Sequence, residues 1–101
     1  MLIVRGGFVY IITNPKHTVL YTGVTNDLKR RIAEHRDRIH PGSFTARYNC
    51  YELVYFMGYP FVTEAIGEEK RIKAGDRKQK IKLIQDMNPE WKDLWEEVKN
   101  W

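Results

Sequence analysis

The stretch FVYIITNPKHTVLYTG, residues 8–23, decides the fold of this chain. Residues 8–13 are rich in β-branched and aromatic side chains, and residues 19–23 have the same character, which is typical of strands. Between them, residues 14–17 contain the asparagine and proline that are common in turns. The stretch therefore predicts a β-hairpin.

A helix and a third strand are predicted after the hairpin. Asn26 and Asp27 offer side-chain oxygens to the first free amides of a helix that we expect over residues 27–39. The apolar stripe of this helix consists of Leu28, Ile32 and Ile39. A polar loop is then expected to lead to a strand over residues 51–57.

Two further helices are predicted next. The first follows Pro60 and Thr63 and ends at Gly75, where a left-handed residue is favoured beyond the last turn. Its apolar side consists of Ala65, Ile66 and Ile72. The second begins at Asp76, and Gln79 three residues later completes a capping-box pattern.

The last predicted helix begins at Asn88, with Pro89 in its first turn. Its helical apolar spacing is formed by Trp91, Leu94, Trp95 and Val98. The resulting order, ββαβααα, predicts an α+β fold with a three-stranded antiparallel sheet flanked by helices. A chain of 101 residues has room for one hydrophobic core, so we expect residues 1–101 to form a single domain.

The composition argues against a disulfide framework and a membrane span. Cys50 is the only cysteine, which fits a buried thiol in a reducing compartment. Arg5 and the two glycines after it interrupt the N-terminal apolar run far short of the ~20 residues that cross a bilayer. No cleavable signal pattern is visible, and we therefore expect a cytoplasmic protein without membrane contact.

Basic residues are concentrated in the first part of the chain. Residues 1–89 contain 15 basic and 9 acidic side chains, whereas residues 90–101 contain 2 basic and 4 acidic ones. The densest run consists of Lys70, Arg71, Lys73, Arg77, Lys78, Lys80 and Lys82. This run is typical of a surface that binds a nucleic-acid backbone, but the solvated face of two consecutive helices has the same composition.

Glu69 stands out because it falls within the apolar stripe of its predicted helix, whereas Glu68 faces water. A carboxylate in such a position is usually paired, protonated or bound to a metal, because burying an unpaired charge is costly. Two interpretations remain open at this point: Glu69 binds a metal ion, or it forms an i,i+4 ion pair with Lys73.

Polar side chains on the first helix and the hairpin form a second group of candidates. Arg31 and His35 lie one turn apart at the border of the apolar stripe, where they are suited to bind a phosphate. A surface arginine and a core histidine would produce the same pattern. Tyr10 and Tyr21 lie on adjacent predicted strands and could point to one place, although core tyrosines would be spaced in the same way.

In order and spacing, FVY, YTG, NDLKRRIAEH, EEKRIKAG and MNPEW resemble the motifs of the GIY-YIG nuclease superfamily. The resemblance spans nearly the whole chain and is greatest to small single-domain bacterial members that are similar to the N-terminal nuclease domain of the ABC excinuclease. Tyr10 matches the tyrosine of the GIY motif, and Tyr21 and Gly23 match the YIG motif. Phe8 replaces the first glycine, and Thr22 replaces the isoleucine of the second motif.

The resemblance implies functions for several residues and a substrate for the protein. Arg31 matches the catalytic arginine and Glu69 the metal-binding glutamate, while His35 and Asn88 match residues near the site. It implies a magnesium- or manganese-dependent endonuclease with one metal ion, acting on nucleic acid and on DNA rather than RNA. Tyr10 is then expected to activate water with a lowered pKa, with His35 as a rival base or proton relay. The backbone-binding residues would be Lys70, Lys73, Arg77, Lys78 and Lys80.

Two other functions remain open from the sequence. A nucleic-acid-binding module could retain the scaffold and the basic run without cleaving its ligand. A protein-interaction domain could use the tryptophan-rich C-terminal segment, which contains Trp91, Trp95 and Trp101. Tyr48, in the segment FTARY, also matches a frequent aromatic residue of the small bacterial members, with no chemical function implied.

Overall fold

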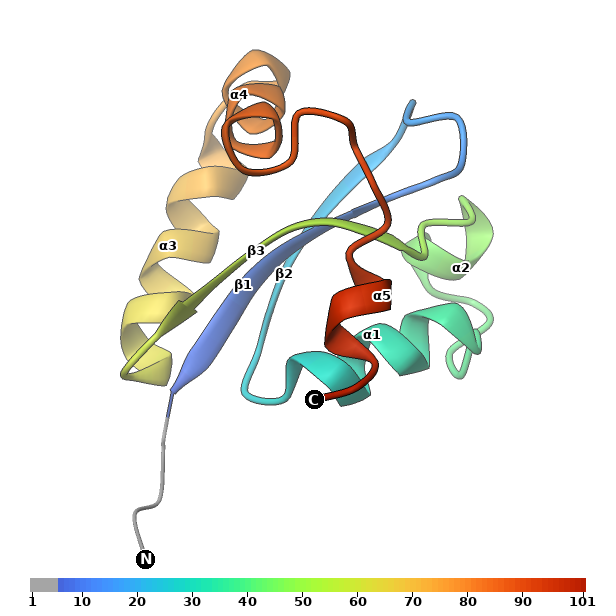
Figure 1. The fold of residues 1–101 in the computed structure, drawn as a ribbon, viewed down its shortest axis with the longest axis horizontal. Helices are drawn as coiled ribbons and strands as arrows, with labels where there is room; N and C mark the ends of the chain where they lie inside the picture. The colour runs from blue at the N-terminus through green and yellow to red at the C-terminus, as the bar shows by residue number, and fades with distance from the viewer. Residues whose placement is uncertain (1–5) are drawn as a thin grey trace, which may run out of the picture.

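A computed structural model describes residues 6–101 of the chain, so the N-terminal run that includes Arg5 lies outside the described residues (Figure 1). The strands are β1 (Gly7–Thr13), β2 (Leu20–Thr25) and β3 (Glu52–Tyr59). They form an antiparallel sheet in the order β2-β1-β3. The helices are α1 (Leu28–Arg36), α2 (Phe44–Arg47), α3 (Val62–Ala74), α4 (Arg77–Met87) and α5 (Trp95–Val98). The predicted α+β class and the three-stranded antiparallel sheet are confirmed.

Helices cover both faces of the sheet. On one face, Tyr10 and Ile12 of β1 pack with Leu28 and Ile32 of α1 and with Val98 of α5. Alternate residues of the same strand point to the other face, where α3 and α4 lie. That second core consists of Val9, Ile11, Val54, Tyr55, Ala65, Ile72 and Ile84. Because both faces are covered, neighbouring residues on one strand belong to different cores.

Local hydrogen bonds account for the turn and helix starts that the sequence predicted. The Asn14 carboxamide oxygen accepts from the backbone amides of Thr18 and Val19, both at 2.9 Å, and so closes the hairpin. The Asp27 side chain accepts from the Arg30 amide and caps α1. At the start of α4, Asp76 and Gln79 form the predicted capping box.

The region between α1 and β3 differs from the prediction. Helix α1 ends at Arg36 rather than at residue 39, and Ile39 is 55% exposed instead of buried. The expected polar loop contains the short helix α2, whose start is capped by the Ser43 hydroxyl. Arg38 has a positive φ of 51°, which turns the chain out of the helical direction before Ile39 can reach the core.

The predicted start and end of α3 also need correction. Helix α3 begins at Val62 after Phe61, without a side-chain cap, and Ile66 in its expected apolar stripe is 38% exposed. Gly75 has φ −75° and ψ 165°, an extended rather than a left-handed conformation. Glycine is nevertheless favoured there because a Cβ at this position would lie 2.4 Å from the capping oxygen of Gln79.

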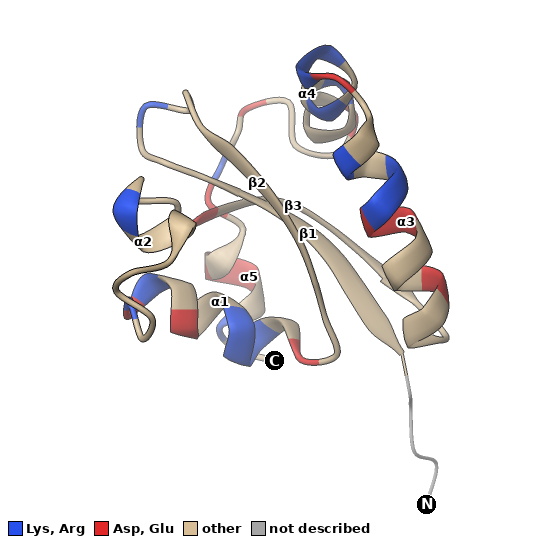
Figure 2. Ribbon diagram, turned by 180° about the vertical axis from the view of Figure 1, so that it is seen from behind, with Lys and Arg blue, Asp and Glu red and all other residues tan. Residues whose placement is uncertain are grey.

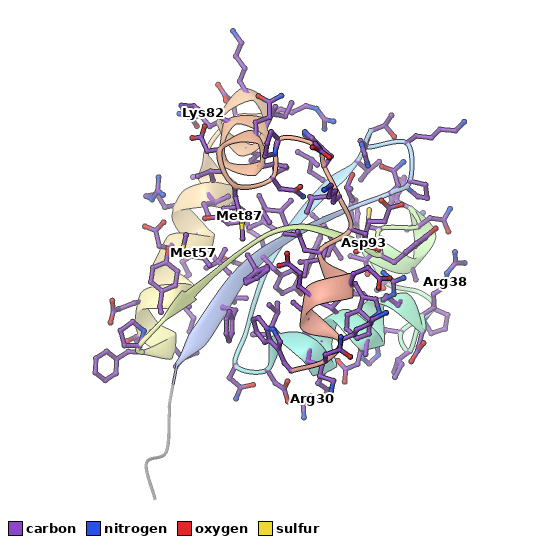
Figure 3. The ribbon with its side chains drawn as sticks, in the orientation of Figure 1. Arg30, Arg38, Met57, Lys82, Met87 and Asp93 are labelled. Carbon is purple, nitrogen blue, oxygen red and sulfur yellow. The ribbon has the colours of Figure 1, made fainter. Side chains whose placement is uncertain are left out.

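The last predicted helix is much shorter than expected. Asn88 ends α4 instead of starting a helix, Trp91 has a positive φ of 54°, and only Trp95–Val98 is helical. Residues 88–94 instead run along the outer edge of β3, where the Leu94 amide donates to the Leu53 carbonyl. Asp93 helps to hold this segment, since its carboxylate accepts from the Leu53 amide and from Arg36 (Figure 3).

No helix among residues 6–101 is long and apolar enough to cross a membrane. This agrees with the expectation drawn from the hydropathy of the sequence.

Candidate active site

Tyr10 lies at the centre of the candidate site and is buried in the sheet. It occupies the middle of β1, is 2% exposed and faces α1. Gly23 lies directly opposite it on β2. A Cβ at Gly23 would lie 2.4 Å from the Tyr10 hydroxyl oxygen, so the absence of a side chain there lets the phenol cross the neighbouring strand.

A chain of hydrogen bonds connects the sheet to α2 through α1. The Tyr10 hydroxyl lies 2.9 Å from Nε2 of His35, and Nδ1 of His35 lies 3.1 Å from the hydroxyl of Thr45. The Thr45 hydroxyl is in turn 3.3 Å from the Ser43 hydroxyl. His35 is therefore held from both ring nitrogens, one by the sheet and one by α2.

The charge states of this chain follow from burial. Burial lowers the pKa of His35 to about 4, and the nearby Arg31 guanidinium acts in the same direction. A neutral imidazole has one donor and one acceptor nitrogen. If Nδ1 donates to Thr45, then Nε2 accepts from the Tyr10 hydroxyl and every member of the chain is satisfied.

The predicted lowering of the Tyr10 pKa is wrong. Burial raises the pKa of the Tyr10 phenol well above its usual range, and the charge of Tyr21 adds to this effect. Arg31 lowers the pKa, as expected, but its effect is smaller than that of burial. Tyr10 is therefore a hydrogen-bond donor at neutral pH in the isolated protein.

An open cleft of about 190 Å³ lies in front of His35, between β2, α1 and α2. Tyr21 and His35 form part of its wall, and their rings meet edge to face with centroids 6.0 Å apart. Arg31 also lines the cleft, and its side chain is 41% exposed and 3.5 Å from Glu34. The structure thus brings Tyr10, Tyr21, Arg31 and His35 together, with Tyr10 behind the others.

Glu69 lies at the β2 side of this group, outside the residues that line the cleft. Its side chain is 12% exposed, and its carboxylate is 2.9 Å from the Lys73 ammonium. The ion pair considered from the sequence is therefore present. The same ammonium is 5.8 Å from the centre of the Tyr21 ring, which connects the pair to the site.

Asn88 is not part of the cleft. Its amide nitrogen donates to the carbonyls of Val54 and Lys92, and its amide oxygen accepts from the Lys92 backbone. Val54 has no partner on β1 because the register shifts by one residue between Ile11 and Ile12. Asn88 thus supports this irregular part of β3, on the sheet edge opposite β2, rather than helping to order the cleft.

The predicted basic surface covers the second half of α3 and α4 (Figure 2). Lys70 and Lys78 are exposed, whereas Arg77 donates to the His17 carbonyl and Lys80 to the Gly75 carbonyl. Lys73 is the member that lies next to Tyr21. The basic surface therefore extends from the edge of the site along the two helices.

Two residues of the site were not singled out from the sequence. Thr45 is buried and bonds His35, and Phe44 stacks on Tyr21 with ring centroids 6.1 Å apart. The available signal was Ser43, which caps α2 and so indicates that the segment is ordered.

Comparison with known proteins agrees with this architecture. The model of the GIY-YIG catalytic domain family matches residues 6–82. The chain therefore belongs to the GIY-YIG family, a family of nucleases.

Within this family the chain is similar to proteins named UPF0213. One from Staphylococcus epidermidis is 35% identical over 79 residues, which cover 78% of this chain and 94% of the relative. One from Clostridium perfringens is 38% identical over 77 residues, covering 76% and 81%. The solution NMR structure of the UPF0213 protein BH0048 from Bacillus halodurans is 26% identical, covers 87% of this chain and 92% of that chain, and gives a TM-score of 0.56.

Proposed function

We propose that the protein is an endonuclease that hydrolyses phosphodiester bonds of nucleic acid, with DNA preferred to RNA. The observation that carries this proposal is the arrangement around His35. A neutral imidazole is bonded to a buried tyrosine, lies at the wall of an open cleft and has Arg31 one turn away. An arginine to bind the phosphate and a group to accept a proton are two requirements of phosphodiester hydrolysis.

Arg31 would bind the scissile phosphate. Its planar guanidinium matches two phosphate oxygens, and its ion pair with Glu34 is long enough at 3.5 Å to be exchanged for a phosphate. In the cleft it would also stabilise the additional negative charge of the transition state. The Tyr21 hydroxyl would position the same phosphate.

Tyr10 and His35 would take the proton of the attacking water together. A free tyrosinate is disfavoured because burial raises the pKa of Tyr10. This is avoided if Tyr10 accepts a proton from water while its own proton passes to Nε2 of His35, 2.9 Å away. A phosphate anion bound at Arg31 would raise the pKa of His35 from about 4 and make it a better acceptor.

Glu69 would hold one Mg²⁺ or Mn²⁺ ion. Among residues 6–101 no group of three or more histidine, cysteine, aspartate or glutamate side chains could hold a metal. A single carboxylate nevertheless fits Mg²⁺, which keeps several waters and often binds one protein carboxylate together with substrate phosphate. When bound, the ion would supply charge neutralisation at the leaving oxygen.

The ion pair between Glu69 and Lys73 favours a second candidate, a module that binds nucleic acid without cleaving it. Lys73 neutralises the only carboxylate that we assign to the metal, at 2.9 Å, so the site is electrostatically satisfied without an ion. In that case the basic surface would bind the backbone and the cleft would be inert. Metal binding separates the two candidates.

The test is cleavage of labelled single-stranded, duplex, flapped and branched DNA and RNA with Mg²⁺, Mn²⁺ or EDTA. Glu69→Gln keeps the size of the side chain but removes its charge, so we expect it to abolish metal-dependent cleavage while nucleic-acid binding persists. Glu68→Gln is the matched control, because Glu68 pairs with Arg71 on the exposed side of α3. A folded Glu69→Gln protein that cuts at the parental rate would exclude Glu69 as the metal ligand.

A further inference from the structure

Three aromatic rings lead from the cleft onto the surface of α2. Tyr21 stacks on Phe44 with ring centroids 6.1 Å apart and planes at 30°, and Phe44 contacts Tyr48 with centroids 4.7 Å apart. Phe44 is 47% exposed and Tyr48 is 46% exposed. We call these three residues the aromatic series.

Packing of the protein core does not account for the outer two rings. Helix α2 has a single turn, and Thr45 is its only buried residue. A lone exposed aromatic residue is ordinary, but two adjacent ones in line with a third at a cleft form an ordered apolar surface beside the site. The helix therefore presents these rings to solvent at the place where a substrate would enter.

The surroundings of the aromatic series are basic. Arg31, Arg38 and His40 line the cleft beside Phe44, and the Arg47 guanidinium lies 6.0 Å from the centre of the Tyr48 ring. Arg38, labelled in Figure 3, is bonded to the side chain of Asn49. Positive charge alternating with exposed rings is the combination that binds a polyanion whose uncharged parts are flat, because each part of the ligand then meets its complement.

We propose that the aromatic series is a stacking platform for an unpaired nucleobase next to the phosphate in the cleft. This inference rests on the proposed function and specifies its substrate: a single-stranded segment, or the unpaired part of a branched or flapped nucleic acid. In a duplex the base faces are stacked on each other, so only an unpaired base can offer a face to Phe44 or Tyr48. Stacking on aromatic side chains tolerates any base, so the platform selects for strandedness rather than sequence.

The test compares binding of equal-length single-stranded DNA, single-stranded RNA and duplex DNA, in EDTA so that no strand is cut. Removing a stacking ring is expected to weaken single-strand binding about tenfold, which corresponds to about 1.4 kcal/mol. We therefore expect Tyr48→Leu to show this loss for single strands and less than a twofold change for the duplex. The DNA and RNA arms identify which unpaired strand the platform prefers.

Two matched variants isolate the ring. Tyr48→Phe keeps the ring and should bind single strands like the parent. Phe61→Leu removes a ring that is 61% exposed at the start of α3 and should leave all affinities unchanged. A strand carrying 2-aminopurine should lose fluorescence on binding to the parent and regain it with Tyr48→Leu. The proposal is overturned if Tyr48→Leu binds single strands as tightly as the parent, or loses single-strand and duplex affinity equally.

Cleavage by the same proteins in Mg²⁺ distinguishes a failure of this inference from a failure of the proposed function. If Tyr48-dependent single-strand binding is found without cleavage by the parent, the platform stands and the hydrolase falls. If the parent cuts single strands and duplexes alike and Tyr48→Leu matches it, the hydrolase stands and the platform falls. Both fall if the parent binds no nucleic acid.

Discussion

Replacing Gly23 by alanine tests the geometry on which the site depends. The added Cβ would lie 2.4 Å from both the hydroxyl oxygen and the Cζ atom of Tyr10. Ordinary contact begins near 3.4 Å, so the phenol must move by about 1 Å, or the strands must separate by a similar amount. A shift of that size is enough to break the 2.9 Å hydrogen bond to His35.

The cost can be estimated from the two effects. Overpacking a buried site costs about 1–3 kcal/mol, and losing the hydrogen bond adds about 1 kcal/mol. The sum, about 2–4 kcal/mol, should lower the melting temperature by roughly 10–25 °C for a domain of about 100 residues. Because Tyr10 would also lose its bond to His35, cleavage by the folded fraction should fall as well.

Thermal melting followed by circular dichroism measures the first effect, with two glycines as controls. Gly42→Ala and Gly67→Ala each place a Cβ where nothing lies within 4 Å. Gly42→Ala should melt like the parent, and Gly67→Ala, in the middle of α3, should stabilise the protein by about 0.5–1 kcal/mol. If Gly23→Ala melts like Gly42→Ala, the close approach of Tyr10 to β2 is refuted.

Three further predictions concern pH, the edge of β3 and salt. The pKa of His35 is about 4 in the folded protein, below its ordinary 6.5, so the unfolded state binds more protons between these values and stability should fall as the pH drops from 6.5 to 4. After allowing for partial solvent exposure we expect about 1–2 kcal/mol, and urea unfolding should show a shallower pH dependence for His35→Gln than for the parent. Asn88→Ala removes three buried or half-buried hydrogen bonds and should cost about 2–3 kcal/mol in urea unfolding, whereas the exposed Asn100→Ala should cost nothing; equal stabilities would contradict the structural role of Asn88. Charge reversal at Lys78 and Lys80 should weaken DNA binding and flatten its dependence on salt, and an unchanged slope would mean that this surface does not contact the backbone.

Much of the backbone was predictable because its signals are local. The turn at Asn14 and the capping box at Asp76 each depend on hydrogen bonds between residues a few positions apart, so the sequence contains the whole interaction. Strand alternation likewise placed Tyr10 and Gly23 on neighbouring strands. The family resemblance added which of these residues belong to a nuclease site, and the structure brings four of them together.

Positions that depend on packing between distant elements were not predictable in the same way. Asn88 followed by Pro89 has the local pattern of a helix start, yet the structure uses its amide group to support Val54, 34 residues earlier in the chain. Ile39 has the spacing of a buried residue, but the chain leaves the helix before it can reach the core. In both cases a non-local contact outweighed a local preference.

The sequence by itself determined which side chains could take part in catalysis, because residue identity and motif spacing are written in it. The tertiary structure alone decided their states and surroundings. Burial keeps His35 neutral and raises the pKa of Tyr10, and α2 brings Thr45 and Phe44 to the cleft. The physical reason is that a pKa and the shape of a cleft depend on everything packed around a group, and that environment exists only once separate segments have come together.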